Sequence, residues 1–200
     1  RHLQQAEISS DNRAIHIFSE GKRLERLSLK LLDLYLAQHQ QPALVPTAPG
    51  EILQDLADHL APGLAREGIA LSAESEPGAC LLEPDLFRSL LLNLVDNSRK
   101  ALEKGGRIAL TCTMTETGCR LTVEDNGRGM PPEVLAHLTE AFYRVDKSRA
   151  RAQGGAGLGL ALCERIAVLH GGAIHFASTP FPWKEAAHET RPFPCAAPAG

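Results

Sequence analysis

The stretch LLLNLVDNSRKAL, residues 90–102, places two asparagines, Asn93 and Asn97, inside a strongly apolar run. Residues four apart share one face of a helix, so both amides point the same way, and Lys100 lies about one turn beyond Asn97. Packing alone does not explain two amides and a lysine on one stripe. An amide oxygen is a suitable ligand for Mg²⁺, and the lysine can meet phosphates that hold the same ion. The structural alternative is that both amides cap or bridge neighbouring backbone groups.

Length and composition indicate a soluble, globular chain of 200 residues, 44% hydrophobic and 22% charged, enough for one domain and a smaller appendage. The net charge of -3 gives no overall field that would favour nucleic acid. No apolar run approaches the ~20 residues of a membrane-spanning helix. The opening RHLQQAEISSD shows no starting Met and no signal peptide, so we expect a boundary inside a longer protein. The five cysteines form no C-x-x-C pair and are expected to be small hydrophobes in a reducing compartment.

An apolar heptad seam runs through a proline-free stretch near the start of the chain. Its a and d positions are Ile17, Leu24, Leu27, Leu31 and Leu34. Polar residues fill the positions between, which favours a helical hairpin or a dimer arm. A helix packed on its own domain is the alternative. The Pro-rich stretch QPALVPTAPG, residues 41–50, then predicts a linker and a domain boundary.

Beyond the linker, helical and strand patterns alternate. The expected elements are a helix over 51–66, short strands in 68–75 and 78–84, a helix over 85–103 capped by Asp85, a hairpin over 107–125, a helix from about 158 to 170 and a strand in 171–179. This order predicts an α+β sandwich, a sheet with helices on one face. The tail over 180–200 holds five of the 13 prolines and is expected to be largely unpacked.

The stretch VEDNGRGM, residues 123–130, ends a predicted strand at a carboxylate. Asp125 can accept a hydrogen bond from an exocyclic amine, and Gly127 and Gly129 leave room for a flat ring against the backbone. A simple D-N-G turn is the structural alternative.

A glycine cluster, GGAGLGL at residues 154–160, directly precedes a predicted helix. It fits neither a Walker A loop nor a Rossmann fingerprint, because its spacing and the preceding charged loop are wrong for both. Glycines let a backbone approach a ligand, and a helix start offers N–H groups to phosphate. A flexible loop with a cap explains the glycines equally well.

These pieces occur together and in order, and the chain resembles the catalytic ATP-binding region of bacterial sensor histidine kinases, of the GHKL ATPase superfamily. LLLNLVDNSRKA resembles the N box, EDNGRGM the G1 box, EAFYRVDKSRAR the F box and GGAGLGLAL the G2 box. FSEGKRLERLSLKLLDL resembles the second helix of the dimerisation and phosphotransfer hairpin. The resemblance spans roughly residues 11–178 and implies a Bergerat-type α+β fold. The implied domains are the partial hairpin in 1–40, the linker in 41–50, the ATP-binding domain in 51–179 and an atypical tail in 180–200.

The resemblance implies ATP and Mg²⁺ as cofactors. Asn97 would hold Mg²⁺, with Asn93 and Lys100 at the phosphates. Asp125 would accept from the adenine amine in a pocket shaped by two glycines. Those glycines are Gly127 and Gly129.

The resemblance also implies a lid over about 131–156 that orders on ATP binding. Phe142 would anchor this lid, and Arg144 and Arg149 would contact phosphate from it. The end of the lid would act as a hinge and offer backbone N–H groups. The ATP-binding residues at that end are Gly155, Gly157, Leu158 and Gly159.

The implied reaction is transfer of the γ-phosphoryl group of Mg·ATP to a histidine, for relay to a response regulator. The N-terminal helix would form a homodimer, and the cytoplasmic chain would belong to a membrane-anchored parent. Nothing matches the acceptor pattern H-E-[LF]-[RK]-T-P, since neither His2 nor His16 qualifies, so we expect no histidine phosphorylation by this chain alone. The alternatives are a GHKL ATPase or anti-sigma serine kinase, and a nucleotide-binding, dimerising fragment without phosphotransfer.

Three further details accompany the resemblance. Ser98 stands where the N box usually has Ala, and Arg99 points away from the stripe and is expected at the surface. After Ser178 the sequence lacks the G-x-G-T turn and final strand that the family usually shows.

Overall fold

The computed structural model of the chain describes residues 42–102, 104–143 and 157–178, part of 18–35, and the backbone of 186–190 and 193–194. The residues described between 18 and 35 are all helical, as the heptad spacing predicts. None of the helices in the described ranges has the length and apolarity needed to cross a membrane.

The main sheet is mixed and has six strands. Along its path lie β2 (Ala70–Ser75), β4 (Arg107–Thr115), β5 (Gly118–Asp125), β7 (Ala186–Thr190) and β6 (Ile174–Ala177), with β8 (Phe193–Pro194) also paired to β5. β2 and β4 run parallel, whereas the other pairs are antiparallel. A separate two-stranded sheet joins β1 (Val45–Thr47) to β3 (Cys80–Leu82).

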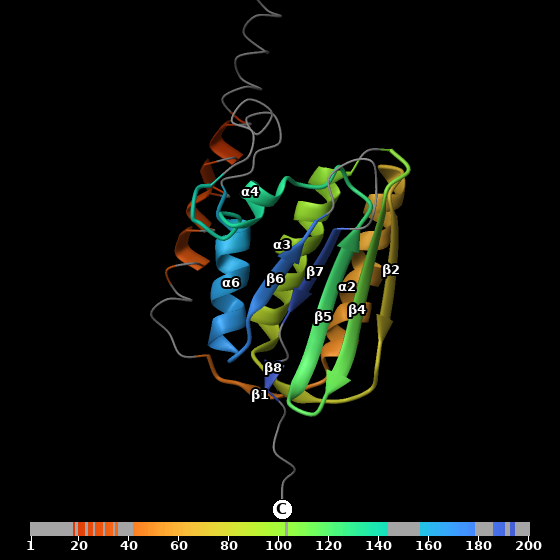
Figure 1. Ribbon diagram of the computed structural model, residues 1–200, viewed down its shortest axis with the longest axis vertical. Helices are drawn as coiled ribbons and strands as arrows, with labels where there is room; N and C mark the ends of the chain where they lie inside the picture. Colours follow the sequence, from red (N-terminus) through yellow and green to blue (C-terminus); the bar gives the residue numbers. More distant parts are fainter. Residues whose placement is uncertain are drawn as a thin grey trace, which may run out of the picture.

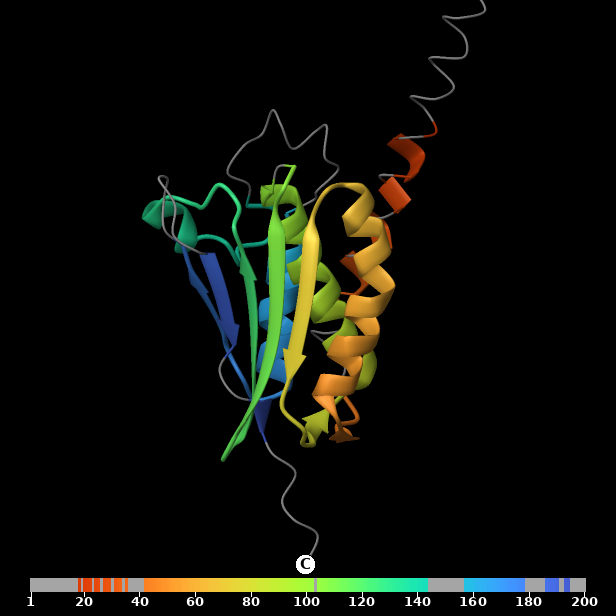
Figure 2. The same cartoon turned by 90° about the vertical axis from the view of Figure 1, so that its right-hand side faces the viewer.

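Helices of the described ranges cover one face of the main sheet (Figures 1 and 2). They are α2 (Pro49–Arg66), α3 (Pro84–Ala101) and α6 (Gly159–Leu169). The short α4 (Pro132–Leu135) lies at the end where β5 finishes. This arrangement confirms the predicted α+β sandwich of a mixed sheet with helices on one face.

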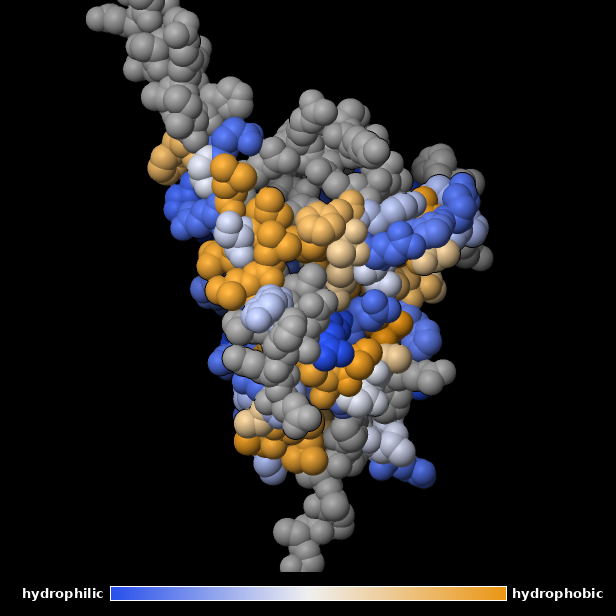
Figure 3. Space-filling view, turned by 90° about the vertical axis from the view of Figure 1, so that its left-hand side faces the viewer, coloured by the Kyte–Doolittle hydropathy of each residue, from blue (hydrophilic) through white to orange (hydrophobic). Residues whose placement is uncertain are grey.

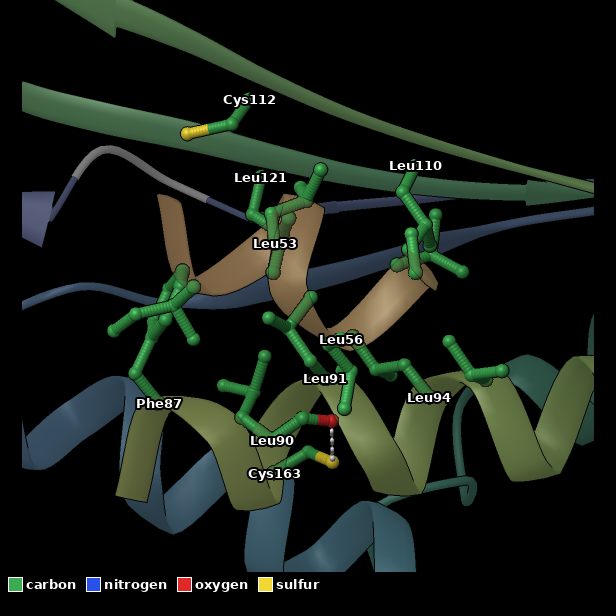
Figure 4. Packing of buried hydrophobic residues seen from close by; sticks show 14 of the residues in the cluster. Leu53, Leu56, Phe87, Leu90, Leu91, Leu94, Leu110, Cys112, Leu121 and Cys163 are labelled. Atoms are coloured by element: carbon green, nitrogen blue, oxygen red, sulfur yellow. Dashed lines mark hydrogen bonds between the residues drawn. The ribbon is translucent and has the colours of Figure 1, made fainter. Parts of the chain in front are cut away.

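The core lies between these helices and the sheet, with α3 at its centre (Figure 4). Phe87, Leu90, Leu91 and Leu94 of α3 are fully buried and point toward α2 and the strands. Full burial of one such side chain contributes about 1.5–3 kcal/mol. Cys163 of α6 fits the same core, and its Sγ donates to the Leu90 carbonyl oxygen at 3.7 Å. The four described cysteines are all buried and none of them forms a disulfide, as expected of small hydrophobic residues. Cys195 lies outside the described residues.

The start of α3 differs from the prediction that Asp85 caps this helix. Glu83 is the N-cap residue, and its side chain accepts from the Leu86 backbone N–H at 2.5 Å. Pro84 occupies the first helical position, where its missing N–H costs nothing. Asp85 therefore lies inside the first turn, where its charge suits the positive end of the helix dipole.

The predicted linker over 41–50 is wrong for its second half. Val45–Thr47 pairs antiparallel with β3, and Pro49 already begins α2. Pro46 can stand in this strand because both strands of a two-stranded sheet are edges, where one N–H can be missing. The Pro-rich composition hid the strand, since its partner is more than 30 residues away.

The prediction of an unpacked tail over 180–200 is wrong for two segments, β7 and β8. β7 lies between β5 and β6 and pairs antiparallel with both, while β8 pairs with the start of β5. The sequence of β7, AAHET, lacks the apolar alternation that marks a strand. Its strand conformation rests on backbone hydrogen bonds to two neighbours, which no local pattern encodes.

Candidate functional site

The residues of the N box and the G1 box meet where α3 and β5 end, at the top of Figure 1. A Cβ placed on Gly127 would lie 2.7 Å from Asp125 Oδ1 and 2.9 Å from both the Cβ and the carbonyl oxygen of Ala101. The Arg128 N–H donates to that same carbonyl at 3.3 Å. The loop after β5 therefore passes directly over the last turn of α3, and only glycine fits at Gly127.

Asp125 ends the buried side of β5. It is 5% exposed and continues the helix-facing alternation of Leu121 and Val123. Its Oδ1 accepts from the Gly127 N–H at 2.9 Å, which fixes the carboxylate beside the end of α3. A buried carboxylate held by a backbone N–H is well placed to accept from a planar amine.

The glycine loop continues to the neighbouring sheet edge. Gly129 has a φ of 66°, a left-handed conformation that favours glycine. The next N–H, of Met130, donates to Ser178 Oγ at 2.7 Å, just after β6 ends. Ser178 is a site-supporting contact that the sequence analysis missed, because a serine after a short strand carries no signal by itself.

The two asparagines of α3 behave differently. Asn93 is half-buried, and its Nδ2 donates to the Ser89 carbonyl oxygen at 2.8 Å, so it makes the backbone bridge named as the structural alternative. Asn97 is also half-buried and lies one turn before Ala101, next to the Asp125 loop. The geometry thus sets Asn97 nearer to the G1 loop than Asn93.

Lys100 is held by a residue that the sequence analysis did not single out. Its Nζ lies 2.5 Å from Asp96 Oδ2, and Arg99 contacts the other oxygen of Asp96 at 3.0 Å. Burial would raise the pKa of Asp96, but the hydrogen bonds and charges of Lys100 and Arg99 together lower it. The spacing of an acid three and four residues before two bases was the available signal.

Arg99 also reaches a second helix. Its Nη1 lies 3.1 Å from Glu67 Oε2, at the residue that caps the end of α2. The side chain of Arg99 is 36% exposed, in agreement with its expected place at the surface. It ties α2 to α3 rather than belonging to the stripe of Asn97.

Phe142, inside the predicted lid, is joined through its backbone to Gly157, the residue just after the lid. The Phe142 N–H donates to the Gly157 carbonyl oxygen at 2.9 Å. A Cβ on Gly157 would lie 2.8–3.0 Å from backbone atoms of Phe142 and Tyr143, and Gly157 has a φ of 71°. Phe142 has a positive φ of 68°, rare for a non-glycine residue, and its side chain is 61% exposed. The contact that closes the lid base is therefore made by the backbone.

The remaining residues expected at the lid fall into two groups. Arg144, Arg149 and Gly155 lie outside the described residues. Leu158 is fully buried as the N-cap residue of α6, so its side chain packs in the core. Gly159 opens the helix, and no side chain among the described residues caps that start.

Comparisons with known proteins identify the class of protein to which this fold belongs. Residues 82–191, just over half of the 200, match the model of the histidine kinase-, DNA gyrase B- and HSP90-like ATPases. The chain belongs to this family.

Relatives at 30% identity or more include a sensor histidine kinase and a sensor protein. The chain is 32% identical over 160 residues to the sensor histidine kinase RppB of Synechocystis, covering 78% of the chain and 35% of that protein. It is 30% identical over 167 residues to the sensor protein SrrB of Staphylococcus aureus, covering 81% of the chain and 28% of that protein. The chain thus spans about a third of the length of these relatives.

Solved structures show the same fold. Full-length ShkA in complex with AMPPNP superposes with a TM-score of 0.75 at 27% identity, covering 90% of this chain and 38% of that one. The histidine kinase AdeS of Acinetobacter baumannii gives a TM-score of 0.72 at 16% identity, covering 88% of this chain and 81% of that one. The predicted membership of the sensor histidine kinase group is confirmed by these relatives.

Proposed function

We propose that this chain binds Mg·ATP at the junction of α3 and the loop after β5, and that it supplies the kinase half of a sensor histidine kinase. The observation that carries the proposal is the contact of Gly127 with both Asp125 and the last turn of α3. The related ShkA structure holds AMPPNP, an adenine nucleotide, on a similar fold.

The adenine ring would be recognised at Asp125. This carboxylate is buried and oriented by the Gly127 N–H, so it can accept from the exocyclic amine of adenine. Guanine presents a carbonyl oxygen at the same place, which a carboxylate repels. Gly127 and Gly129 keep the wall of the pocket at backbone level, where a flat ring can lie.

The phosphates and the metal ion would lie along the polar stripe of α3. Among the described residues no group of three or more His, Cys, Asp or Glu side chains could hold a metal alone. The single amide of Asn97 suits Mg²⁺, which needs few protein ligands when phosphates and water supply the others. When bound, the ion would neutralise negative charge on the phosphates. Lys100 would exchange Asp96 for a phosphate oxygen, and Asn93 would support Asn97 from the preceding turn.

The lid would close over the phosphates from a fixed base. The bond between Phe142 and Gly157 fixes the two ends of the segment between these residues, so ordering that part of the lid would cost less chain entropy. Arg144 and Arg149 stay predicted phosphate contacts within that segment, with Gly155 at its end. The uncapped start of α6 at Gly159 would add backbone N–H donors.

The reaction would be transfer of the γ-phosphoryl group to a histidine outside this chain, for relay to a response regulator. A homodimer through the N-terminal helix would present that histidine.

On the face in Figure 3 apolar side chains lie at the surface. The seam positions Leu24 and Leu31 are 61% and 40% exposed, which supports a missing partner helix. A cytoplasmic location under a membrane-anchored parent stays part of this proposal.

Titration of ATP with and without Mg²⁺, on the wild type and on Asn97→Ala, tests the site. We expect ATP binding to depend on Mg²⁺ and to weaken by roughly 10-fold or more in Asn97→Ala. The substitution removes the proposed metal ligand and, with it, the hold of the ion on the phosphates. Asn126→Ala is not a suitable control because Asn126 supports β4 through the Arg107 N–H at 2.6 Å. Gln54→Ala on the exposed side of α2 is suitable, and it should bind as the wild type does. Unchanged binding by Asn97→Ala would rule out the assignment.

A further inference from the structure

Ser98 has the one deeply buried side-chain polar atom, within the described part of the chain, that has no hydrogen-bond partner. The residue is 1% exposed and follows Asn97 on α3. Ser98 is the last buried residue on the side of α3 that also carries Leu91 and Leu94, so its hydroxyl lies at the end of a row of apolar side chains. A buried hydroxyl without a partner costs stability that alanine would not cost.

Only two other polar or charged residues in the described ranges are buried, Asp125 and His170. Both ring nitrogens of His170 have partners: Nε2 accepts from the Glu83 N–H at the start of α3, and Nδ1 pairs with the Ile166 carbonyl oxygen of α6. Asp125 lies at the other end of α3, where Gly127 touches both its Oδ1 and Ala101. Ala101 is three residues after Ser98 and therefore lies on the same side of the helix one turn later. The unpartnered hydroxyl and the buried carboxylate thus border the same corner between α3 and β5.

The chemistry of adenine matches this pair of groups. Its edge carries an amine, which donates, and directly beside it the ring nitrogen N1, which accepts. A carboxylate that takes the amine leaves N1 facing whatever polar group stands next to it. We propose that the Ser98 hydroxyl recognises adenine N1, directly or through one ordered water, beside Asp125. This inference rests on the proposed function, and it assigns part of the base specificity to Ser98.

The competing explanation is that Ser98 only fills space. Nucleotide affinity distinguishes the two explanations. Replacing Ser98 by alanine should stabilise the nucleotide-free protein under either one, but it should weaken nucleotide binding only if Ser98 contacts the base. Alanine also favours the helix, so Ser98→Ala is expected to fold. A matched control is Ser72→Ala, on the exposed edge of β2.

The experiment is calorimetric titration of ATP and of 1-deaza-ATP, in which a C–H group replaces N1, into the wild type, Ser98→Ala and Ser72→Ala. We expect Ser98→Ala to melt at a higher temperature without nucleotide and to bind ATP roughly 5- to 10-fold more weakly, the size of one hydrogen bond. We expect 1-deaza-ATP to bind the wild type and Ser98→Ala with equal affinity. Ser72→Ala should match the wild type throughout.

Two results would overturn the inference: ATP affinity unchanged in Ser98→Ala, or equal losses for ATP and 1-deaza-ATP. Asn97→Ala and Asp125→Asn, titrated in parallel, separate this failure from that of the proposed function. If both weaken ATP binding while Ser98→Ala does not, only the role of Ser98 is lost. If the wild type binds no ATP, or neither variant weakens it, the site itself is wrong and the role of Ser98 falls with it.

Discussion

Gly127 is required for a reason of space rather than flexibility. Any side chain there would collide with the Asp125 carboxylate and with the end of α3, as the 2.7 Å and 2.9 Å approaches of a Cβ show. Gly129 and Gly157, by contrast, have positive φ angles that glycine adopts without strain. Gly127 and Gly129, both predicted to shape one pocket, are therefore glycine for different physical reasons.

Replacing Asp125 by asparagine should abolish the preference for adenine. The amide keeps an acceptor but loses the charge and adds a donor, so a carbonyl oxygen on the base is no longer repelled. We expect ATP affinity to fall roughly 10- to 100-fold, the range for a hydrogen bond to a charged group, while GTP affinity rises or stays level. Competition titrations of ATP and GTP measure this, with Asp58→Asn on α2 as the control. A retained preference for ATP over GTP would contradict the role of Asp125.

At the scale of elements, α3 and α6 are joined through one buried imidazole. His170 Nδ1 lies 2.7 Å from the Ile166 carbonyl oxygen, and its Nε2 accepts from the Glu83 N–H at 3.0 Å. Because the carbonyl can only accept and the N–H can only donate, the ring must be neutral with its proton on Nδ1. His170 therefore links the end of α6 to the first turn of α3, and holds the helix that carries Asn97.

This link predicts a dependence of stability on pH. Burial lowers the pKa of His170 below its ordinary value, against smaller opposing effects of its hydrogen bonds and of Glu83. The unfolded chain binds a proton near pH 6.5 while the folded protein resists it, so stability is full above that pH and falls as the pH drops. The slope due to His170 is at most about 1.4 kcal/mol per pH unit.

Urea unfolding between pH 8 and pH 5 measures this slope. His170→Gln should be less stable at pH 8 but lose less on acidification, whereas His59→Gln, on the exposed side of α2, should follow the wild type. Equal slopes for the wild type and His170→Gln would show that His170 does not control the pH dependence.

Elements with strong periodicity could be predicted from the sequence, and the others could not. The helix over 51–66 and the hairpin over 107–125 formed as α2, β4 and β5 because one face of each buries apolar residues. β1 and β7 escaped prediction because their stability lies in backbone pairing with distant strands. The cap of α3 was placed two residues late for a local reason, since Pro84 takes the first helical position.

At the scale of the whole molecule, the described residues include the proposed nucleotide site, and no stretch of the sequence matches the acceptor pattern for the phosphoryl group. The chain spans about a third of the length of its sensor kinase relatives, so the acceptor is expected in the remainder of such a protein. We predict that the purified chain incubated with radiolabelled Mg·ATP forms no acid-labile, base-stable phosphohistidine, although it binds the nucleotide. A relative's hairpin supplied separately serves as the positive control for labelling. Strong self-labelling of the chain would show that one of its own histidines is an acceptor.

The polar stripe of α3 and the carboxylate at the end of β5 could be predicted from the sequence, because helix and strand periods fix which residues share a face. The glycine boxes were recognised from their residues and their order along the chain. The sequence also determined the family, through four motifs in order. The folded structure was needed to show that Gly127 lies against both Asp125 and Ala101, and that the Ser98 hydroxyl is buried without a partner among the described residues. The physical reason is that these contacts join segments separated by a strand, a helix turn or a loop, and sequence periodicity carries no information about distances between elements.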